Sequence, residues 1–488
     1  MKKILIILMV FMVALSACQK LEDLNKNTKD FTAVPGEGIY NGAIRNLLNQ
    51  LYTFNVNNNN TQLYMQYFAE TTYPDESRYD MVTRPVPANH MNALYRTVLM
   101  NLKDATNVLT AAPLGGIDAK QRKNQLAIIE IVSVFTWSNL VETFGDMPYS
   151  EALDFSIPSP KYDDAFTIYK ALITRLDAAL ASMDPAFGGM GAGYDNIYGG
   201  GVAGTAKWIR FANTLKMRMG LVLADKDPAL SKTIVDAAEP KAFIAGDKCA
   251  LTYLSASPNQ NPVYTEVVVS GRFDFVVTSS ITDPMNTLND PRRAYYLWTK
   301  IDGEYKGGAQ GMPNSYASFT HIDNALLKPE REVVVMDYAE AEFLRAEAAA
   351  RGTYAVTDAA THYNNAIKAS ITAWGGTAAE ADTYLAQPAV AYATATGTWQ
   401  QKIGEQAYYA YYMRGFTSWL TWRRLDYPRL KGAEKHVAEV AGIPLRYSYP
   451  VSEQTLNGAN YKAAAAAIGG DNALTKLFWD KESYDTLK

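Results

Sequence analysis

The chain has 488 residues, of which 48% are hydrophobic and 20% are charged, an ordinary globular composition that excludes an intrinsically disordered or collagen-like protein. Its 46 Lys and Arg against 50 Asp and Glu give a net charge of -4, which argues against a nucleic-acid-binding surface. Tyrosine is in surplus, with 32 residues, and its ring with a polar tip suits wet interfaces and ligand pockets.

The first segment is typical of a bacterial lipoprotein signal. Lys2 and Lys3 precede an apolar run at residues 4–15, which is too short to cross a hydrocarbon core of about 30 Å. Residues 15–18 (LSAC) resemble a lipobox, in which the cysteine thiol receives a lipid. We therefore expect cleavage after residue 17 and fatty acyl chains, such as palmitate, on Cys18. The alternative is an ordinary secretory peptide with a chance cysteine.

A polar segment follows the expected lipidation site. Residues 18–35 lack helical periodicity and predict a lipidated N-terminus and tether that reaches at most about 60 Å when extended. Loss of Lys2 and Lys3 lowers the Lys and Arg count to 44 against 50 acidic residues, a net charge of -6. Cys249 is the only other cysteine, so structural disulfides are not expected. Residues 36–488 remain for a ligand-binding domain.

Most of this domain has the periodicity of helices. Residues 126–144 are apolar nearly all round but contain polar interruptions, which predicts a buried core helix rather than a membrane span. From Phe166 to Met183, apolar residues recur with a period near 3.6, and we expect Asp163 to cap the start of this helix. These two helices could form a pair.

A second pair is expected in the C-terminal half. Residues 338–351 predict a helix closed by Gly352, and Ala359, Tyr363 and Ala366 match part of the second helix of a tetratricopeptide repeat. Strand patterns are few.

The strand patterns and the irregular segments complete the fold prediction. Residues 264–270 and 332–336 are the best strand candidates, too sparse for a sheet-based architecture. The sequence thus predicts a mainly α single globule with long irregular segments. Long loops in a compact domain often bind ligands. The irregular segments that stand out are residues 71–92, 188–204 and 259–319.

Several phrases together resemble the SusD/RagB family of nutrient-binding outer-membrane lipoproteins, particularly its second SusD-like branch. They occur in the family's order along the chain. The phrases are residues 144–149, 207–218, 290–292, 340–352, 419–428 and 443–453.

The resemblance implies a SusD-like helical scaffold with four tetratricopeptide-like units, anchored by lipid to the outer membrane and exposed at the cell surface. It also implies a TonB-dependent, SusC-like transporter as partner, to which captured glycan oligosaccharides are delivered for nutrient uptake. Some members of the family bind peptides instead, which is the alternative here. The tail after Asn457, with alanines at 463–467, departs from the pattern.

Most residues of these phrases are interpreted as structural. We expect Trp208 to lie in a helix core, and Arg423 and Arg424 to pair with buried carbonyls or carboxylates. The other aromatic residues interpreted as packing are Trp419, Trp422, Tyr408, Tyr409, Tyr411 and Tyr412.

No motif predicts an enzyme. The four histidines have no zinc-site spacing, and the GxGxxG match at residues 199–204 has no preceding strand. We expect no catalytic residue, metal site, cofactor or nucleic-acid partner. Two open alternatives are a glycoside hydrolase, which needs only two carboxylates, and a pure tetratricopeptide-type scaffold.

Aromatic and polar residues in the irregular segments are the candidate ligand contacts. Aromatic planes bind the apolar C–H faces of sugar rings, while Arg, Asp and Asn bond hydroxyl pairs at the ring edges. The candidates are Tyr73, Asp75, Arg78, Tyr79, Tyr264, Arg272, Phe273, Trp298, Tyr305 and Tyr316.

Overall fold

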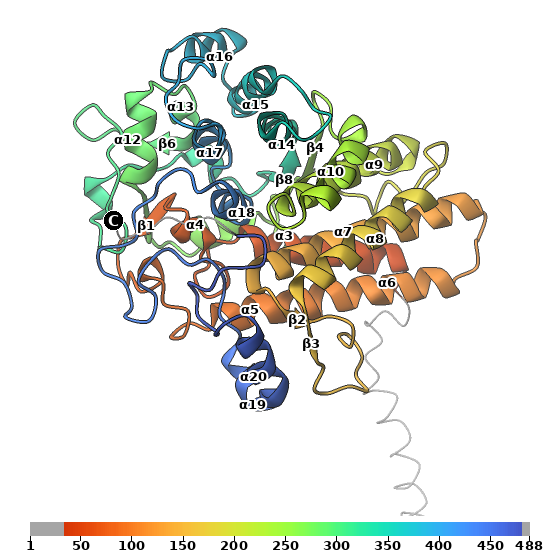
Figure 1. Ribbon diagram of the computed structural model, residues 1–488. Helices are drawn as coiled ribbons and strands as arrows, with labels where there is room; N and C mark the ends of the chain where they lie inside the picture. The colour runs from red at the N-terminus through yellow and green to blue at the C-terminus, as the bar shows by residue number, and fades with distance from the viewer. Residues whose placement is uncertain (1–33, 481–488) are drawn as a thin grey trace, which may run out of the picture.

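The structure is a computed structural model that describes residues 34–480 (Figure 1). The expected signal segment at residues 1–17, the lipidation site Cys18 and the tether up to residue 33 lie outside the described residues. The first described helix, α3, begins at Gly36, where the predicted ligand-binding domain begins.

Four pairs of packed helices form the scaffold and confirm the mainly α prediction. Both pairs expected from the sequence are present. The pairs are α3 (Gly36–Tyr52) with α6 (Met100–Ala111), α7 (Ala119–Phe144) with α8 (Ala165–Ser182), α9 (Gly201–Val222) with α10 (Pro228–Ala238), and α14 (Tyr338–Arg351) with α15 (Ala359–Ala373).

Helix α7 lies in the core of this scaffold (Figure 1). It is long and apolar enough to cross a membrane, the only such helix among residues 34–480, but 89% of its most apolar window is buried inside the protein. Its polar groups are used internally: Glu142 accepts a 2.7 Å hydrogen bond from the Tyr169 hydroxyl of α8. The prediction of a core helix is confirmed.

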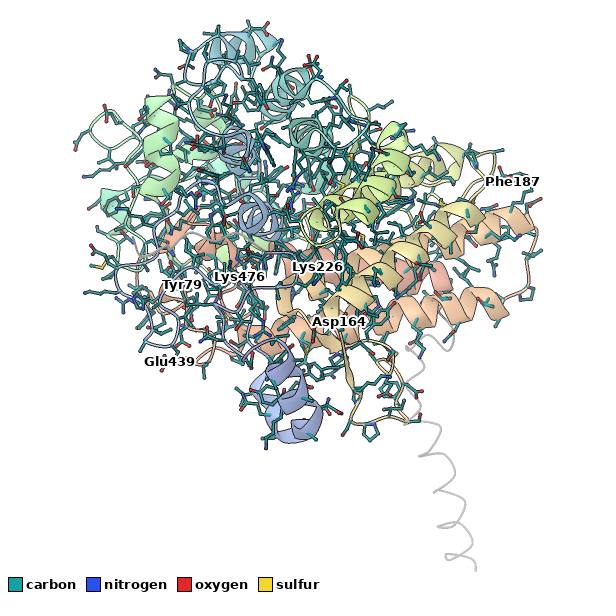
Figure 2. All side chains as sticks on the ribbon, viewed as in Figure 1. Tyr79, Asp164, Phe187, Lys226, Glu439 and Lys476 are labelled. Carbon is teal, nitrogen blue, oxygen red and sulfur yellow. The ribbon has the colours of Figure 1, made fainter. Side chains whose placement is uncertain are left out.

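The expected cap of α8 was wrong by one residue. Asp164, not Asp163, caps the helix, with its carboxylate accepting a 2.7 Å bond from the Thr167 amide. Asp163 lies in strand β3, and its carboxylate accepts a 2.7 Å bond from the Ser150 amide. Two adjacent aspartates are equally good caps by sequence, and strand pairing decides between them. Figure 2 shows Asp164 at the start of α8.

The strands form four separate antiparallel two-stranded sheets among the described residues. The predicted strand at 332–336 is confirmed as β8. The pairs are β1 (Phe68–Glu70) with β5 (Phe275–Val277), β2 (Met147–Pro148) with β3 (Tyr162–Asp163), β4 (Lys248–Leu251) with β8 (Val333–Asp337), and β6 (Leu297–Trp298) with β7 (His321–Ile322).

The predicted strand at 264–270 is wrong. The segment is helical, with α11 (Pro262–Tyr264) continued by the π-helical turn η4 (Thr265–Val269). The Asn261 side chain accepts hydrogen bonds from the first amides of this helix, and proline occupies the first helical position. These start signals outweigh the β-branched residues that suggested a strand.

The remaining elements connect and cover the pairs. Two of the segments predicted to be irregular, residues 71–92 and 259–319, contain short helices. The remaining elements are α4 (Thr61–Tyr64), η1 (Glu76–Arg78), α5 (Val86–Asn92), η2 (Ala93–Leu99), η3 (Glu239–Lys241), α12 (Ser279–Thr287), α13 (Arg293–Tyr296), η5 (Tyr316–Ser318), η6 (Asn324–Leu326), α16 (Ala378–Leu385), α17 (Trp399–Ala410), α18 (Gly415–Leu425), α19 (Val451–Leu456) and α20 (Gly458–Ala467).

The motif residues interpreted as structural are buried. Trp208 donates a 3.0 Å bond to Asp195, and Trp419 donates a 2.7 Å bond to the Pro444 carbonyl. Arg423 donates to the carbonyls of Glu142 and Leu445, both at 2.8 Å. The other core aromatics of these motifs are Trp422, Tyr408, Tyr409, Tyr411 and Tyr412, and Arg424 binds the Glu347 carboxylate at 2.6 Å.

Candidate ligand-binding site

Aromatic rings gather at the ends of the sheets β1–β5 and β6–β7: Phe273 and Trp298 are exposed, and Tyr316 and His321 are half-buried. We call these four residues the aromatic platform. Phe273 is 67% exposed, and its ring centroid lies 4.8 Å from that of Tyr316. Tyr316 stacks on His321, with centroids 3.6 Å apart and planes inclined by 10°. Trp298, 50% exposed, pairs with His321 in the β6–β7 register. Contacts and strand pairing therefore link the four rings.

The β1–β5 pairing brings a second loop to the platform. Beyond the last paired residues, the Thr71 amide donates to the Asp274 carbonyl at 2.8 Å, and the Thr71 hydroxyl donates to the Phe273 carbonyl at 2.6 Å. Tyr73 follows two residues later with a φ of 53° and is 68% exposed. A left-handed residue with an exposed ring thus follows two positions after the Thr71 contacts with the Phe273–Asp274 backbone.

Hydrogen bonds within the loops hold the platform in place. His321 Nε2 lies 2.6 Å from the Tyr316 carbonyl oxygen, which fixes the two stacked rings together. The Thr320 hydroxyl donates to the Thr299 carbonyl at 3.0 Å and accepts from the Lys306 amide at 2.9 Å. The Tyr316 and His321 rings are therefore positioned before any ligand arrives, which lowers the entropy lost on binding.

Charged groups flank the exposed rings. Arg272 forms an ion pair with Asp274 at 2.7 Å, with 59% of the Arg272 side chain exposed. In the neighbouring loop, Arg78 Nε donates to the Gly311 carbonyl at 2.8 Å, and the half-buried Asp75 uses its carbonyl to accept from the Arg78 amide. Arg272 is therefore the better placed of these candidates to meet sugar hydroxyls, since Arg78 is partly engaged in holding the loop.

Tyr79 is not part of the exposed surface. Its side chain is completely buried, its ring packs edge-on against Tyr64 at 6.1 Å, and its hydroxyl accepts a 2.8 Å bond from the Ala433 amide. Burial raises the pKa of this hydroxyl. Figure 2 shows Tyr79 in the part of the molecule that holds α4, α12, α13, β1 and β6 in Figure 1, which we call the loop-rich half. A surface ligand cannot reach it, so Tyr79 leaves the candidate site.

Two further candidates are half-buried and separate from the platform contacts. Tyr264 ends α11, and its amide faces the Asn261 cap. Tyr305 carries Lys300 Nζ 5.2 Å from its ring centroid, and its carbonyl accepts a 2.7 Å bond from Asn286. Burial raises the pKa of the Tyr305 hydroxyl. Neither ring has a described ring contact with the platform.

His321 is the platform residue that the sequence did not single out. A lone histidine in a loop carries no ligand signal, and only the pairing of β6 with β7 and the stacking on Tyr316 give it a place. The spacing of five residues to Tyr316 offers no periodicity from which the contact could be predicted.

Two buried carboxyl groups lie at the base of the 71–79 loop. Glu70 is 3% exposed and accepts bonds from the Ser77 amide and hydroxyl at 2.9 and 2.8 Å, while Glu76 is 1% exposed and pairs with Arg84 at 3.0 Å. Burial, and next the neighbouring Glu76, raise the pKa of Glu70 to about 8. Glu70 therefore keeps its proton to a higher pH than an exposed glutamate does, and both carboxyl groups are buried out of reach of a surface ligand.

The chain is similar to a known protein family and to several solved structures. The model of the SusD-like_2 family, described as starch-binding associating with outer membrane, matches residues 28–450. No curated protein matches significantly. A solved chitin-binding protein is 24% identical, with a TM-score of 0.77 over 92% of this chain and 100% of its own. A chitin-binding SusD homologue from Flavobacterium johnsoniae is 23% identical, with a TM-score of 0.75 over 91% of this chain and 99% of its own. A SusD homologue from Bacteroides uniformis is also 23% identical, with a TM-score of 0.74 over 91% of this chain and 99% of its own.

Proposed function

The chain belongs to the SusD-like_2 family, and from that membership we propose that it is a cell-surface lipoprotein that captures glycan oligosaccharides without cleaving them and delivers them to a TonB-dependent transporter. The family is described as starch-binding and outer-membrane-associated. The aromatic platform is the observation in this chain that supports glycan capture.

The platform suits saccharides because it offers apolar faces beside charged edges. Phe273 has no polar atom in its side chain, so its exposed ring serves only an apolar partner such as the C–H face of a sugar. Arg272 and Asp274 stand next to it and can bond ring hydroxyls. Stacking combined with hydrogen bonds at the rim is the usual composition of a small-molecule site.

Attachment to the membrane follows from the N-terminal sequence. Acyl chains on Cys18 would hold the chain firmly, since each buried CH₂ contributes about 0.8 kcal/mol and two chains suffice for stable anchoring. Residues 18–35 then lead to α3, which begins at Gly36. Mass spectrometry of the membrane fraction tests this step: a mature chain that keeps residues 1–17, or an unmodified Cys18 thiol, would contradict the anchor.

Binding without catalysis is favoured over hydrolysis. A glycoside hydrolase needs two carboxyl groups that flank the scissile bond. The carboxyl pair at the base of the 71–79 loop, Glu70 and Glu76, is buried and bonded to Ser77 and Arg84. No sugar can lie between them in this structure. Release of reducing ends from a bound oligosaccharide would overturn the proposal.

The decisive experiment is calorimetric titration of the detergent-solubilised full chain with chitohexaose, maltohexaose and a neutral hexapeptide. We expect one of the saccharides to bind, and Phe273→Ala to weaken that binding by about 1 kcal/mol or more, since a stacked ring is lost. Phe155, which is 90% exposed in the β2–β3 loop, provides the matched control. Phe155→Ala should bind normally. Binding of the hexapeptide alone, or equal binding by both variants, would contradict glycan capture on the platform.

The transporter partner is tested separately. We expect a large outer-membrane barrel protein to co-purify with the full chain from solubilised membranes. A pure scaffold would co-purify in the same way but would show no saturable oligosaccharide binding, so the two experiments together separate capture from scaffolding.

A further inference from the structure

A second concave surface lies apart from the aromatic platform, between helices α12 and α17. This α12–α17 cleft has a volume of about 730 Å³, within the range of small-molecule sites. Residues 428–431 and part of the 389–396 segment complete its walls. None of the candidate ligand residues from the sequence lines it.

The charged residues of the α12–α17 cleft are mostly cationic. Lys402, Arg429 and Lys431 line it together with a single acidic residue, Glu405. Lys402 Nζ donates to the Tyr392 carbonyl at 2.8 Å and lies 5.2 Å from the Tyr392 ring centroid, and this bond leaves two of its three N–H donors. Lys431 is exposed. Its backbone carbonyl, not its side chain, accepts a hydrogen bond from the side-chain amide of Gln66. The cleft thus offers ammonium groups in a protein of net negative charge.

Glu405 is the acidic residue among the charged residues that line the cleft. Its carboxyl accepts a 2.9 Å bond from the Gln401 side chain, and burial raises its pKa, so it gains a proton more readily than an exposed glutamate. A carboxyl group of this kind is suited to bonding sugar hydroxyls. The three cationic residues, Lys402, Arg429 and Lys431, outnumber this one carboxyl group.

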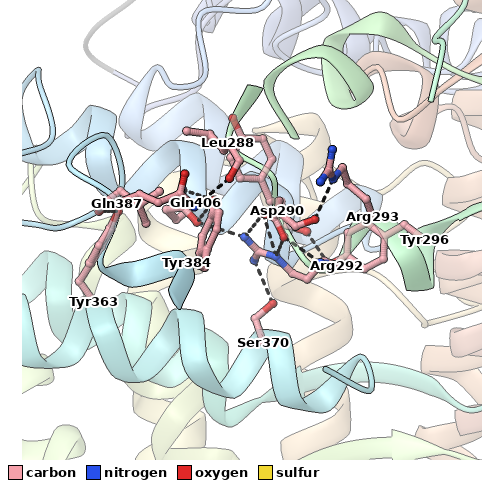
Figure 3. Close-up of polar contacts among 12 residues, drawn as sticks. Leu288, Asp290, Arg292, Arg293, Tyr296, Tyr363, Ser370, Tyr384, Gln387 and Gln406 are labelled. Carbon is pink, nitrogen blue, oxygen red and sulfur yellow. Dashed lines mark hydrogen bonds and ion pairs between the residues drawn. The ribbon is translucent and has the colours of Figure 1, made fainter. Parts of the chain in front are cut away.

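A buried polar network supports the floor of the cleft (Figure 3). Arg292 is completely buried and binds Asp290 at 2.5 Å, which cancels its charge locally. Its other N–H groups donate to Ser370 and Gln406, both at 3.1 Å. Gln406 lines the cleft and also accepts a 3.2 Å bond from the Tyr384 hydroxyl. These bonds hold Gln406 in place, so this side of the cleft is rigid, as a preformed site requires.

The cleft offers hydrogen bonds and charge rather than stacking. Its tyrosines, Tyr363, Tyr408 and Tyr409, are only 1%, 2% and 3% exposed, so they present no ring face to a sugar. Gln401, Ser279 and Ser280 add polar groups along the walls. This chemistry differs from that of the aromatic platform.

The cleft and the platform lie close enough to act on one ligand. Strand β5 leads from the platform directly into α12, and Phe273 and Ser279 are six residues apart, at most about 20 Å. The Ser279 amide also donates to the Gly308 carbonyl at 3.0 Å, within the loop that separates the platform strands β6 and β7. Both sites belong to the loop-rich half of Figure 1.

We propose that the α12–α17 cleft binds the carboxylate-bearing unit of an acidic oligosaccharide. In this arrangement Lys402 and Lys431 face the carboxylate, and Glu405 and Gln401 face ring hydroxyls. The inference rests on the proposed glycan capture and adds its substrate class: saccharides that contain a uronic or sialic acid.

The experiment measures the preference of the detergent-solubilised full chain for acidic over matched neutral ligands. The probes are trigalacturonate with its methyl ester, and 3′-sialyllactose with lactose. We expect at least one acid to bind about 10-fold or more tightly than its neutral counterpart, since hydrogen bonds to a charged group are the stronger ones. Added salt should weaken this preference.

Lysine variants locate the effect. Lys402→Gln and Lys431→Gln should each reduce the preference for the acid, and the double variant should abolish it. Lys123→Gln, which changes an exposed lysine of α7, is the matched control and should change nothing. If Lys402→Gln lowers the melting temperature through loss of its bond to Tyr392, Lys431→Gln alone decides the question, because only the carbonyl of Lys431 is used in the fold.

Two results would overturn the proposal: neither acid binds better than its neutral partner, or the preference survives in the double variant. Failure of glycan capture itself looks different. In that case neutral oligosaccharides would not bind the wild-type chain, and Phe273→Ala would have no effect.

Discussion

The helix-pair scaffold and the loop-rich half use the same residue types in opposite ways. In the scaffold, two arginines pair with little exposure to solvent: Arg345 binds Glu239 at 2.7 Å and Arg424 binds Glu347 at 2.6 Å. In the loop-rich half, the Arg272–Asp274 pair lies at the surface, next to the exposed ring of Phe273. A side chain whose partners are all internal contributes to the fold, whereas one left in water is available to a ligand.

Tryptophan shows the contrast most directly. Trp208 in α9 is 1% exposed and bonded to Asp195, while Trp298 in β6 is 50% exposed. An exposed ring of this size gains little from folding. Its position beside His321 is better explained by binding than by stability.

Replacing these two tryptophans should separate the regions with the largest effect. We expect Trp208→Ala to lower the free energy of unfolding by about 3–5 kcal/mol, because it opens a cavity in the core and leaves Asp195 without its bond. Trp298→Ala should leave unfolding nearly unchanged and weaken oligosaccharide binding. Urea denaturation and calorimetry measure the two quantities. A large loss of stability in Trp298→Ala would show that this ring holds the loop rather than a ligand.

The second effect concerns the raised pKa of Glu70 at the base of the 71–79 loop. The pKa of Glu70 is about 8 in the folded chain against an ordinary value of 4.5, so the folded form keeps a proton that the unfolded chain releases. Stability therefore falls as pH rises between about 4.5 and 8, by at most about 1.4 kcal/mol per pH unit, and levels off above 8.

Glu70→Gln should remove most of this slope and raise stability at pH 8, because the amide stays neutral and can still accept from the Ser77 amide. Glu76, Arg84 and Asp75 are the other charged groups around the pair. Denaturant titrations from pH 5 to 8.5 provide the measurement, with Glu330→Gln as an exposed control. Parallel pH profiles for Glu70→Gln and the unmodified chain would rule out a raised pKa of Glu70.

The sequence predicted the scaffold better than the site because the scaffold depends on local patterns. The helix at 338–351 with Gly352 as its end agrees with α14, since periodicity and a left-handed glycine are local signals. The strand predicted at 264–270 failed because a cap at Asn261 decides the conformation from outside the apolar run. The pattern of residues 264–270 alone does not contain Asn261, so it could not predict the helix start.

The site depends on contacts between distant segments. Tyr73 and Phe273 lie near each other only because β1 pairs with β5, and His321 meets Trp298 only through the β6–β7 pairing. Tyr73 and Tyr79 read alike as tyrosines in one polar loop, yet one is 68% exposed and the other is completely buried. Residue type identified the loops that carry exposed rings, and the fold decides which rings reach solvent.

That pair of tyrosines supplies the smallest of the expected effects and the sharpest comparison within one loop. In Tyr79→Phe the ring still fills its place against Tyr64, but the buried Ala433 amide loses the hydroxyl that accepts its bond. We expect a loss of about 1–2 kcal/mol in the free energy of unfolding, typical of a buried donor left unpaired. Tyr73→Phe removes a hydroxyl from an exposed ring and should change stability by less than about 0.5 kcal/mol. Denaturant unfolding of both variants at the same pH gives the comparison; equal losses would mean that the two tyrosines share one environment and that the loop does not divide into a buried base and an exposed rim.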